Sequence, residues 1–205
     1  MKIKKMGKPV VFVLCSGGAV AVDWEDQNLD AVLAGWYGGQ AAGTAMADVL
    51  FGKINPSGKL PVTFYSFSNE LPPFDSYEME NRTYRFMTEK PLYPFGYGLS
   101  YTQFEYENAK YDPAGRVFTC KIKNVGKYNG EEVAQLYMTN KDDKQGPVKT
   151  LVGFKRVFVP AGKSVTVSFQ VDDEFFQTFS DERQHLEIHP GHFVFYYGDK
   201  VMEVK

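Results

Sequence analysis

The chain is poor in cysteine, with only two in 205 residues, and these two lie in different halves. Cys15 and Cys120 each belong to an apolar, strand-like stretch, where a free thiol packs as a small buried hydrophobic group. We therefore expect no disulfide. Their scarcity excludes a disulfide-stabilised scaffold but does not indicate a cellular compartment.

The chain also lacks an excess of one charge and a long hydrophobic run. Its formal net charge is -2, and its lysines and arginines are spread along the sequence. This pattern argues against a surface for nucleic acids or anionic membranes. The apolar run at residues 9–14 is too short for a signal-peptide core or a membrane span. We predict neither nucleic acid nor membrane as a partner, and these residues carry no export signal that would fix the localisation.

Histidine is scarce as well, and His185, His189 and His192 all fall near the end of the chain. Two of them flank Pro190 and Gly191, which are turn residues, and no aspartate or cysteine completes a recognised ligand spacing. We favour histidines of a surface loop over a zinc site. The sequence predicts no metal and no other cofactor.

The first half of the chain has an α/β pattern. Residues 9–15 form a branched, apolar run that suits a parallel strand covered on both faces, and residues 31–36 favour a second strand. An apolar stripe after a glycine pair predicts a helix that ends at Gly52, and residues 60–64 form a further extended segment. Because so few fully apolar strands would leave an exposed edge, we expect the neighbours of this sheet to precede residue 1.

Residues 91–101 mark a change of pattern, with two prolines, two glycines, one phenylalanine and three tyrosines and no helical period. We interpret this stretch as an aromatic junction between domains. From residue 103 onward apolar residues alternate with polar ones, as in Phe118, Cys120 and Ile122, and turn residues separate about seven short strands. The second half is therefore predicted to be an immunoglobulin-like β-sandwich.

Acids in the first half are the candidates for chemistry. They lie in predicted loops at strand ends, where α/β enzymes collect catalytic residues. Two carboxylates about 5 Å apart, or about 6.5–9.5 Å apart, hydrolyse glycosides with retention or inversion. The sequence does not give a separation, and solvated loop acids are the alternative. The acids are Asp23, Glu25, Asp26, Glu78 and Glu80.

A second group of candidates could line a substrate pocket or an interface between domains. Arg82 and Arg85 flank Tyr84 and have the chemistry to grip a carboxylate or stack on a ring, while an ion-pair cluster between domains is the alternative. Tyr97 in the junction belongs to the same group. We assign none of these residues a catalytic role.

Several ordered motifs together resemble the C-terminal part of glycoside hydrolase family 3, the family of β-glucosidases and β-xylosidases. The first half matches it at residues 7–14, 34–40, 47–52, 55–64, 82–85 and 93–102. The second half, at residues 123–126, 130–133, 135–137, 151–156 and 190–191, is similar to the fibronectin type III-like domain of many such enzymes.

The resemblance implies a retaining hydrolase of β-linked sugars, built from a barrel, an α/β sandwich and a fibronectin-like module. Its aspartate nucleophile comes from the barrel and its glutamate acid/base from an earlier part of the sandwich or a nearby loop, and neither motif occurs here. Asp23 and Trp24 imitate the Asp-Trp pair of the nucleophile but lie among the sandwich motifs. The chain therefore lacks recognisable catalytic residues, and whether it is an enzyme by itself is left open.

The predicted fold is thus a partial α/β sandwich (residues 1–90), an aromatic junction (91–102) and a fibronectin type III-like sandwich (103–205). The predicted function is the C-terminal part of a β-xylosidase or β-glucosidase that is inactive alone. The alternative is a non-catalytic carbohydrate-binding or partner-docking module, with Tyr196 and Tyr197 as stacking candidates. Expected partners are a β-linked oligosaccharide in the complete enzyme, and the missing barrel or a second copy. A periplasmic or secreted parent enzyme is compatible with the resemblance.

Overall fold

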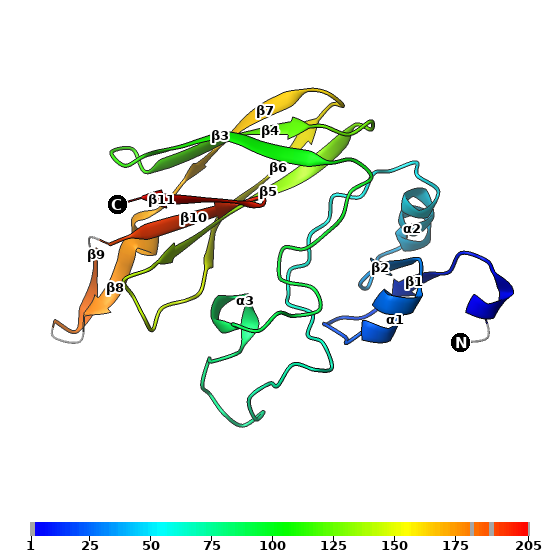
Figure 1. Cartoon of the computed structure of the whole chain (residues 1–205), viewed down its shortest axis with the longest axis horizontal. Coiled ribbons are helices and arrows are strands. Elements are labelled where there is room, and N and C mark those ends of the chain that lie inside the picture. Colours follow the sequence, from blue (N-terminus) through cyan, green and yellow to red (C-terminus); the bar gives the residue numbers. More distant parts are fainter. Residues whose placement is uncertain (1–2, 181–182, 189–190, 205) are drawn as a thin grey trace. The chain divides into compact units, whose positions relative to one another are not determined.

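The computed structural model describes residues 3–180, 183–188 and 191–204. It divides into two compact units (Figure 1). Unit 1 comprises Met1–Ile54 and Lys59–Tyr97, and unit 2 comprises Asn55–Gly58 and Gly98–Lys205. The chain therefore enters unit 2 briefly at residues 55–58, returns to unit 1, and enters unit 2 again at residue 98.

Unit 1 contains a β-α-β segment that follows the short turn η1 (Lys4–Met6). Strand β1 (Val11–Leu14) pairs in parallel with β2 (Ala31–Ala34), and α1 (Asp23–Asn28) lies between them in sequence. The two predicted strands are confirmed. The expected burial on both faces is incomplete among the described residues, because both strands show one exposed and three half-buried positions.

The helix predicted after the glycine pair is α2 (Ala42–Leu50). Gly52 follows its end with φ +72°, in the left-handed region that favours glycine, and its N–H donates to the Val49 carbonyl at 3.0 Å. This C-terminal signal is confirmed. The apolar stripe is less buried than expected, since Leu50 remains 44% exposed.

The extended segment at residues 60–64 is not a full strand. Phe64 forms an isolated antiparallel bridge with Tyr93, and Leu60 donates to the Tyr97 carbonyl at 2.8 Å. The irregular chain between these two arms carries only the one-turn helix α3 (Thr83–Phe86) among its described elements. The aromatic junction is thus paired with residues 60–64 inside unit 1.

Unit 2 is a β-sandwich, as the alternation predicts. Its sheets have the strand orders β11-β10-β5-β6 and β3-β4-β7, and a separate hairpin pairs β8 with β9 (Figure 1). The alternation missed β3, β8 and β11. The bounds are β3 (Phe104–Asp112), β4 (Val117–Asn124), β5 (Gly130–Asn140), β6 (Thr150–Val159), β7 (Ser164–Gln170), η2 (Asp173–Phe176), β8 (Gln177–Ser180), β9 (His185–Ile188), β10 (Phe193–Tyr197) and β11 (Lys200–Val204).

The core of unit 2 lies between its two sheets. Phe118 and Ile122 of β4 meet Leu136 of β5 and Phe195 of β10, and each of these side chains has 0% exposure. Cys120 is buried among them, as predicted for a free thiol. Cys15 was predicted to be buried in a strand, and this prediction is wrong. Strand β1 ends at Leu14, one residue before Cys15, and the Cys15 side chain is exposed.

Two asparagines order the entry to the sandwich. Asn55 accepts hydrogen bonds from Ser100 Oγ (2.9 Å) and the Tyr101 N–H (2.8 Å), and donates to the Asn129 carbonyl (3.0 Å). Asn124 is fully buried and uses both ends of its amide. It donates to the carbonyls of Tyr128 (2.8 Å) and Val159 (2.9 Å) and accepts from Thr102 Oγ1 (2.6 Å) and Gly126 N–H (3.1 Å).

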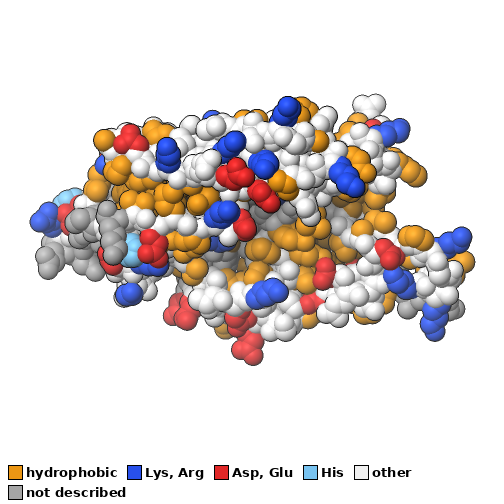
Figure 2. Space-filling view, turned by 45° about the horizontal axis from the view of Figure 1, so that its top comes forward, with side chains coloured by type: hydrophobic (Ala, Val, Ile, Leu, Met, Phe, Trp, Pro, Cys, Tyr) orange, Lys and Arg blue, Asp and Glu red, His pale blue; other side chains and the backbone are white. Residues whose placement is uncertain are grey.

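Charged side chains of both signs are interspersed on the face drawn in Figure 2. In the ranges 3–180, 183–188 and 191–204, no helix combines the length and the apolar character that a bilayer crossing requires.

Candidate functional site

The acids after β1 belong to α1 and not to a loop, which corrects the expectation from the sequence. Both oxygens of Asp23 are engaged: Ser66 Oγ donates to Oδ1, and the Phe67 N–H donates to Oδ2 at 3.3 Å. Asp26 accepts a hydrogen bond from the Tyr93 hydroxyl. These carboxylates therefore tie α1 to two distant segments of unit 1.

An aromatic cluster surrounds the Tyr93 contact. Tyr93 stacks on Tyr97 with ring centroids 5.0 Å apart and an angle of 17° between planes, and it lies 6.3 Å from Phe64. Trp36 meets Phe64 edge-on at 6.2 Å. Burial, followed by the hydrogen bond to Asp26, raises the pKa of Tyr93. Tyr97 keeps 36% exposure and closes the stack on its outer side.

The other residues predicted to line a substrate pocket, Arg82, Tyr84 and Arg85, lie on or beside α3. The Arg82 guanidinium donates to the main-chain carbonyls of Pro73 (2.8 Å), Ser76 (3.0 Å) and Glu78 (2.9 Å). Its donors thus hold a loop together.

The two residues that follow Arg82 in the candidate group contact aromatic rings. Tyr84 stacks on Phe95 at 4.2 Å, and Arg85 lies over the Phe86 ring at 5.7 Å. Whether Arg82, Tyr84, Arg85 and Tyr97 line a sugar pocket stays a prediction.

Of the remaining acids, only Glu25 shares an element with Asp23 and Asp26. Glu25 is half-buried on α1, whereas Glu78 and Glu80 are exposed on the irregular segment before α3. Asp23 and Asp26 already accept hydrogen bonds from neutral donors of the same unit. Their arrangement serves to fix the fold locally.

The described histidines make separate contacts in unit 2. His185 Nδ1 lies 2.9 Å from the Arg183 carbonyl, and His192 Nε2 lies 3.2 Å from Glu203. His189 lies outside the described residues. Within the part of the chain that the structure describes, no group of three or more histidine, cysteine or acidic side chains is placed to hold a metal ion.

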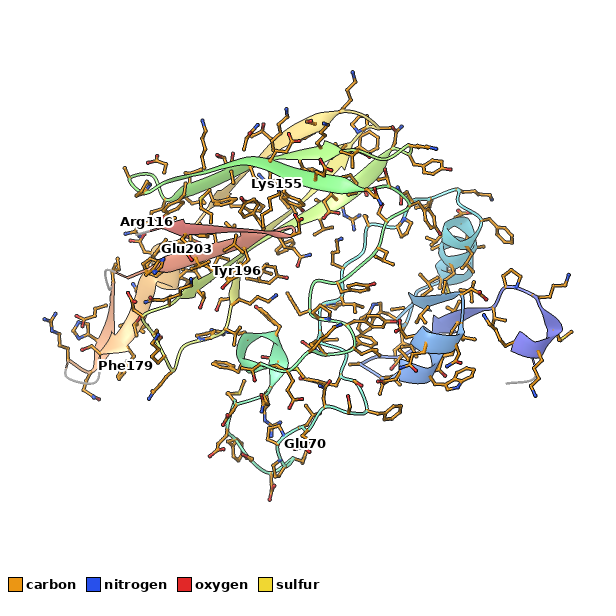
Figure 3. The ribbon with its side chains drawn as sticks, in the orientation of Figure 1. Glu70, Arg116, Lys155, Phe179, Tyr196 and Glu203 are labelled. Atoms are coloured by element: carbon orange, nitrogen blue, oxygen red, sulfur yellow. The ribbon has the colours of Figure 1, made fainter. Side chains whose placement is uncertain are left out.

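Two further corrections concern aromatic residues. Tyr197, expected as an exposed stacking residue, is 8% exposed and packs in the sandwich core 5.1 Å from Phe118. Tyr196, labelled in Figure 3, alternates with it along β10 and is half-buried. The sequence reasoning passed over Phe74 and Tyr77, whose position in an acidic stretch after two prolines was the available signal.

Two family models match these two structural patterns. Residues 1–101 match the glycosyl hydrolase family 3 C-terminal domain, and residues 132–201 match the fibronectin type III-like domain. The chain belongs to glycoside hydrolase family 3. It corresponds to the C-terminal region of family 3 β-glucosidases and β-xylosidases.

Relatives with these activities in their names are similar over nearly the whole chain. A xylan 1,4-beta-xylosidase of Xylanibacter ruminicola is 42% identical over 98% of this chain, and a periplasmic beta-glucosidase of Salmonella typhimurium is 37% identical over 99%. The chain spans 24% and 29% of these two family 3 proteins.

A solved beta-glucosidase structure agrees with the fold. The crystal structure of a beta-glucosidase from Kluyveromyces marxianus matches 99% of this chain with a TM-score of 0.85 and 30% sequence identity, and the match covers 27% of that protein.

Proposed function

We propose that the chain is the C-terminal part of a retaining β-glycosidase that acts on β-linked xylosides or glucosides, and that it is inactive alone. The observation that carries this proposal is the two-stranded parallel sheet of unit 1. Parallel sheets are normally covered on both faces and contain more strands, whereas β1 and β2 are only half-buried here. Unit 1 has the character of a sandwich that a further part of the enzyme completes.

The engaged carboxylates support the same proposal. A retaining mechanism needs one free carboxylate as nucleophile and a second carboxyl as acid/base. Asp23 and Asp26 are hydrogen-bonded within unit 1. Both catalytic carboxylates are therefore proposed to come from residues outside these 205.

In this proposal unit 1 walls the sugar pocket of the complete enzyme and the fibronectin-like unit supports it. The partner of unit 1 is the missing barrel portion, with self-association as the second possibility. The boundary between Tyr97 and Gly98 separates the proposed pocket-forming unit from the supporting unit.

Hydrolysis of aryl β-xyloside and β-glucoside by the purified chain at high concentration tests the proposal. We expect no turnover above that of a heat-denatured sample. Asp23→Ala and Glu78→Ala variants serve as matched controls. Turnover that either substitution abolishes would contradict the proposal, because it would place a catalytic carboxylate within this chain.

A further inference from the structure

Residues 73–82 of unit 1 form a compact loop, here called the aromatic loop. It contains two successive turns: the Ser76 N–H donates to the Pro73 carbonyl at 3.0 Å, and the Arg82 N–H donates to the Met79 carbonyl at 3.0 Å. Compact loops of this size, closed by their own interactions, frequently carry functional side chains.

The Arg82 guanidinium locks these turns together. It reaches carbonyls of the first turn, Pro73 and Ser76, and the carbonyl of Glu78 between the turns. Hydrogen bonds from a charged donor are stronger than neutral ones, and the planar guanidinium fixes the direction of each. The loop is held in shape by main-chain contacts in which its aromatic side chains take no part.

Those aromatic side chains face solvent completely. Phe74 is 101% exposed and Tyr77 is 99% exposed, so neither ring packs on residues that the structure describes. Ordinary loop residues in such positions are polar, because an exposed ring gains nothing from folding. An exposed apolar patch marks a binding surface, and two completely exposed rings three residues apart on one short loop are candidates for such a patch.

The charged residues near the two rings in sequence restrict the class of ligand that the loop can bind. Residues 66–81 contain four acids and no lysine or arginine. Asp75 lies between the two rings in sequence, Glu78 follows the second ring, and Glu70, labelled in Figure 3, precedes the loop in the same irregular segment. An anionic ligand is disfavoured here. Carboxylates accept several hydrogen bonds each and donate none, so they suit a ligand rich in hydroxyl donors.

A neutral sugar ring meets both requirements. In β-linked xylose and glucose units the hydroxyls are equatorial, so each face of the ring presents C–H groups to an aromatic side chain while its rim presents hydroxyls. We propose that the aromatic loop is a binding surface for neutral β-linked xylo- or gluco-oligosaccharides. Phe74 and Tyr77 stack on sugar rings, and Asp75 and Glu78 accept hydrogen bonds from the hydroxyls. The choice of sugar class rests on the proposed function.

Titration of the 205-residue chain with xylotetraose and with cellotetraose, followed by amide NMR shifts and by calorimetry, tests the proposal. We expect saturable binding of at least one sugar, with shifts concentrated at residues 73–82. Phe74→Ala and Tyr77→Ala should each weaken binding about tenfold, since stacked aromatic contacts are lost. Because both rings are completely exposed, the thermal midpoint of the variants should not change.

Two further variants make the test specific. Phe154→Ala removes another exposed ring, 69% exposed on β6, and should leave the affinity unchanged. Arg82→Lys keeps the charge but loses the planar set of donors, and should weaken binding while both rings remain. An oligosaccharide of uronic acids should not compete.

Absence of saturable binding, or binding equally strong in Phe74→Ala and Tyr77→Ala, would overturn the proposal and leave the loop as a protein-docking element. These results are distinct from those that test the proposed function. Binding without turnover supports both proposals. Turnover by the chain that Asp23→Ala abolishes contradicts the proposed function alone, and missing sugar affinity contradicts the aromatic loop alone.

Discussion

At the scale of single residues, buried amides contribute most where they satisfy several partners at once. Asn124 is the clearest case, because its one side chain meets two carbonyls, a hydroxyl and an amide in the interior of unit 2. Losing such a side chain leaves buried donors and acceptors without partners, which costs more than the hydrogen bonds contribute net. The hydrogen bonds of Asn124 therefore hold together the loops at the end of β4.

We therefore expect Asn124→Ala to lower the free energy of unfolding of unit 2 by about 2–4 kcal/mol, at the upper end of single-residue effects. Urea denaturation followed by the fluorescence of the core aromatics measures this. Asn129→Ala is the matched control, because its side chain is exposed and accepts one hydrogen bond from the Ala161 N–H at 3.0 Å. Equal effects of the two substitutions would refute the prediction.

Asp30 gives a prediction for pH. Its carboxylate accepts hydrogen bonds from the Val10 N–H (2.7 Å) and Lys4 Nζ (3.1 Å), and these lower its pKa from the ordinary value of 3.8, the Val10 bond contributing most. Folding therefore favours the ionised form. The stabilising contribution is fully present above the ordinary pKa and is lost as the pH falls through the lowered one.

NMR titration of the Asp30 carboxyl carbon checks this. Lys4→Ala should raise the pKa of Asp30 only partly, because the Val10 hydrogen bond remains. The stability difference between the parent chain and Asp30→Asn should shrink as the pH falls below 3.8. A pKa at or above 3.8 in the parent chain would show that the contact does not form.

At the scale of elements, two glycines at turns show that replacing a glycine can cost free energy in two ways, through the backbone and through packing. The sequence alone does not distinguish these two costs. Gly162 (φ +70°) and Gly198 (φ +55°) both adopt a left-handed backbone. A Cβ at Gly162 would meet nothing within 4 Å, whereas one at Gly198 would lie 2.5 Å from the Tyr106 ring. The first position constrains the backbone only, and the second also constrains packing.

Gly162→Ala should destabilise unit 2 by about 1–2 kcal/mol, the cost of a left-handed backbone for a residue with Cβ. Gly198→Ala should cost about 1–3 kcal/mol more, because the buried Tyr106 ring must move. Thermal unfolding of both variants measures the difference. A Gly198→Ala variant no less stable than Gly162→Ala would mean that the Tyr106 ring moves aside without a cost in free energy.

Individual strands and helices also show where the sequence predicts secondary structure well. Alternation at Phe118, Cys120 and Ile122 identified β4 because one face of that strand is buried and the other is not. It missed β8, where Phe179 points outward in a hairpin outside both sheets, so that burial and polarity no longer correspond. The sequence reasoning also assigned α1 to a loop, because this six-residue helix contains one apolar residue, Trp24, and therefore shows no apolar period.

Site prediction was limited for a related reason. Residue type made Arg82 and Tyr97 candidates for the wall of a pocket or for an interface between domains, but the sequence does not show whether a guanidinium binds a carboxylate or a carbonyl. Only the fold shows that Arg82 is occupied with main-chain oxygens. Complete exposure of Phe74 and Tyr77 likewise depends on three-dimensional structure, since aromatic residues are usually expected to be inside.

At the scale of the whole molecule, unit 2 is completed by a segment distant in sequence. Asn55 holds Ser100, Tyr101 and Asn129, although residues 59–97 of the other unit lie between it and the sandwich in sequence. We expect Asn55→Ala to lower the free energy of unfolding of unit 2 by about 1–3 kcal/mol.

Hydrogen exchange checks the same substitution locally. Protection should fall at the Tyr101 amide, the direct donor to Asn55, while amides in the centre of β4 lose protection only as much as the unit as a whole. Ser57, buried in the same segment, offers a second probe. Unchanged exchange at Tyr101 would show that the contact contributes nothing.

Residues 55–58 belong to unit 2 but precede residues 59–97 of unit 1 in the sequence. This order also has a consequence for folding during synthesis. The ribosome releases Asn55 before any strand of the sandwich exists, and its partner Asn129 follows 74 positions later. Closing so long a loop is slow, because its entropy must be lost before the contact forms. The nascent segment therefore meets Ser100 and Tyr101 only after residues 59–97 have emerged, and it meets Asn129 later still, so the order of synthesis separates residues that the folded unit joins.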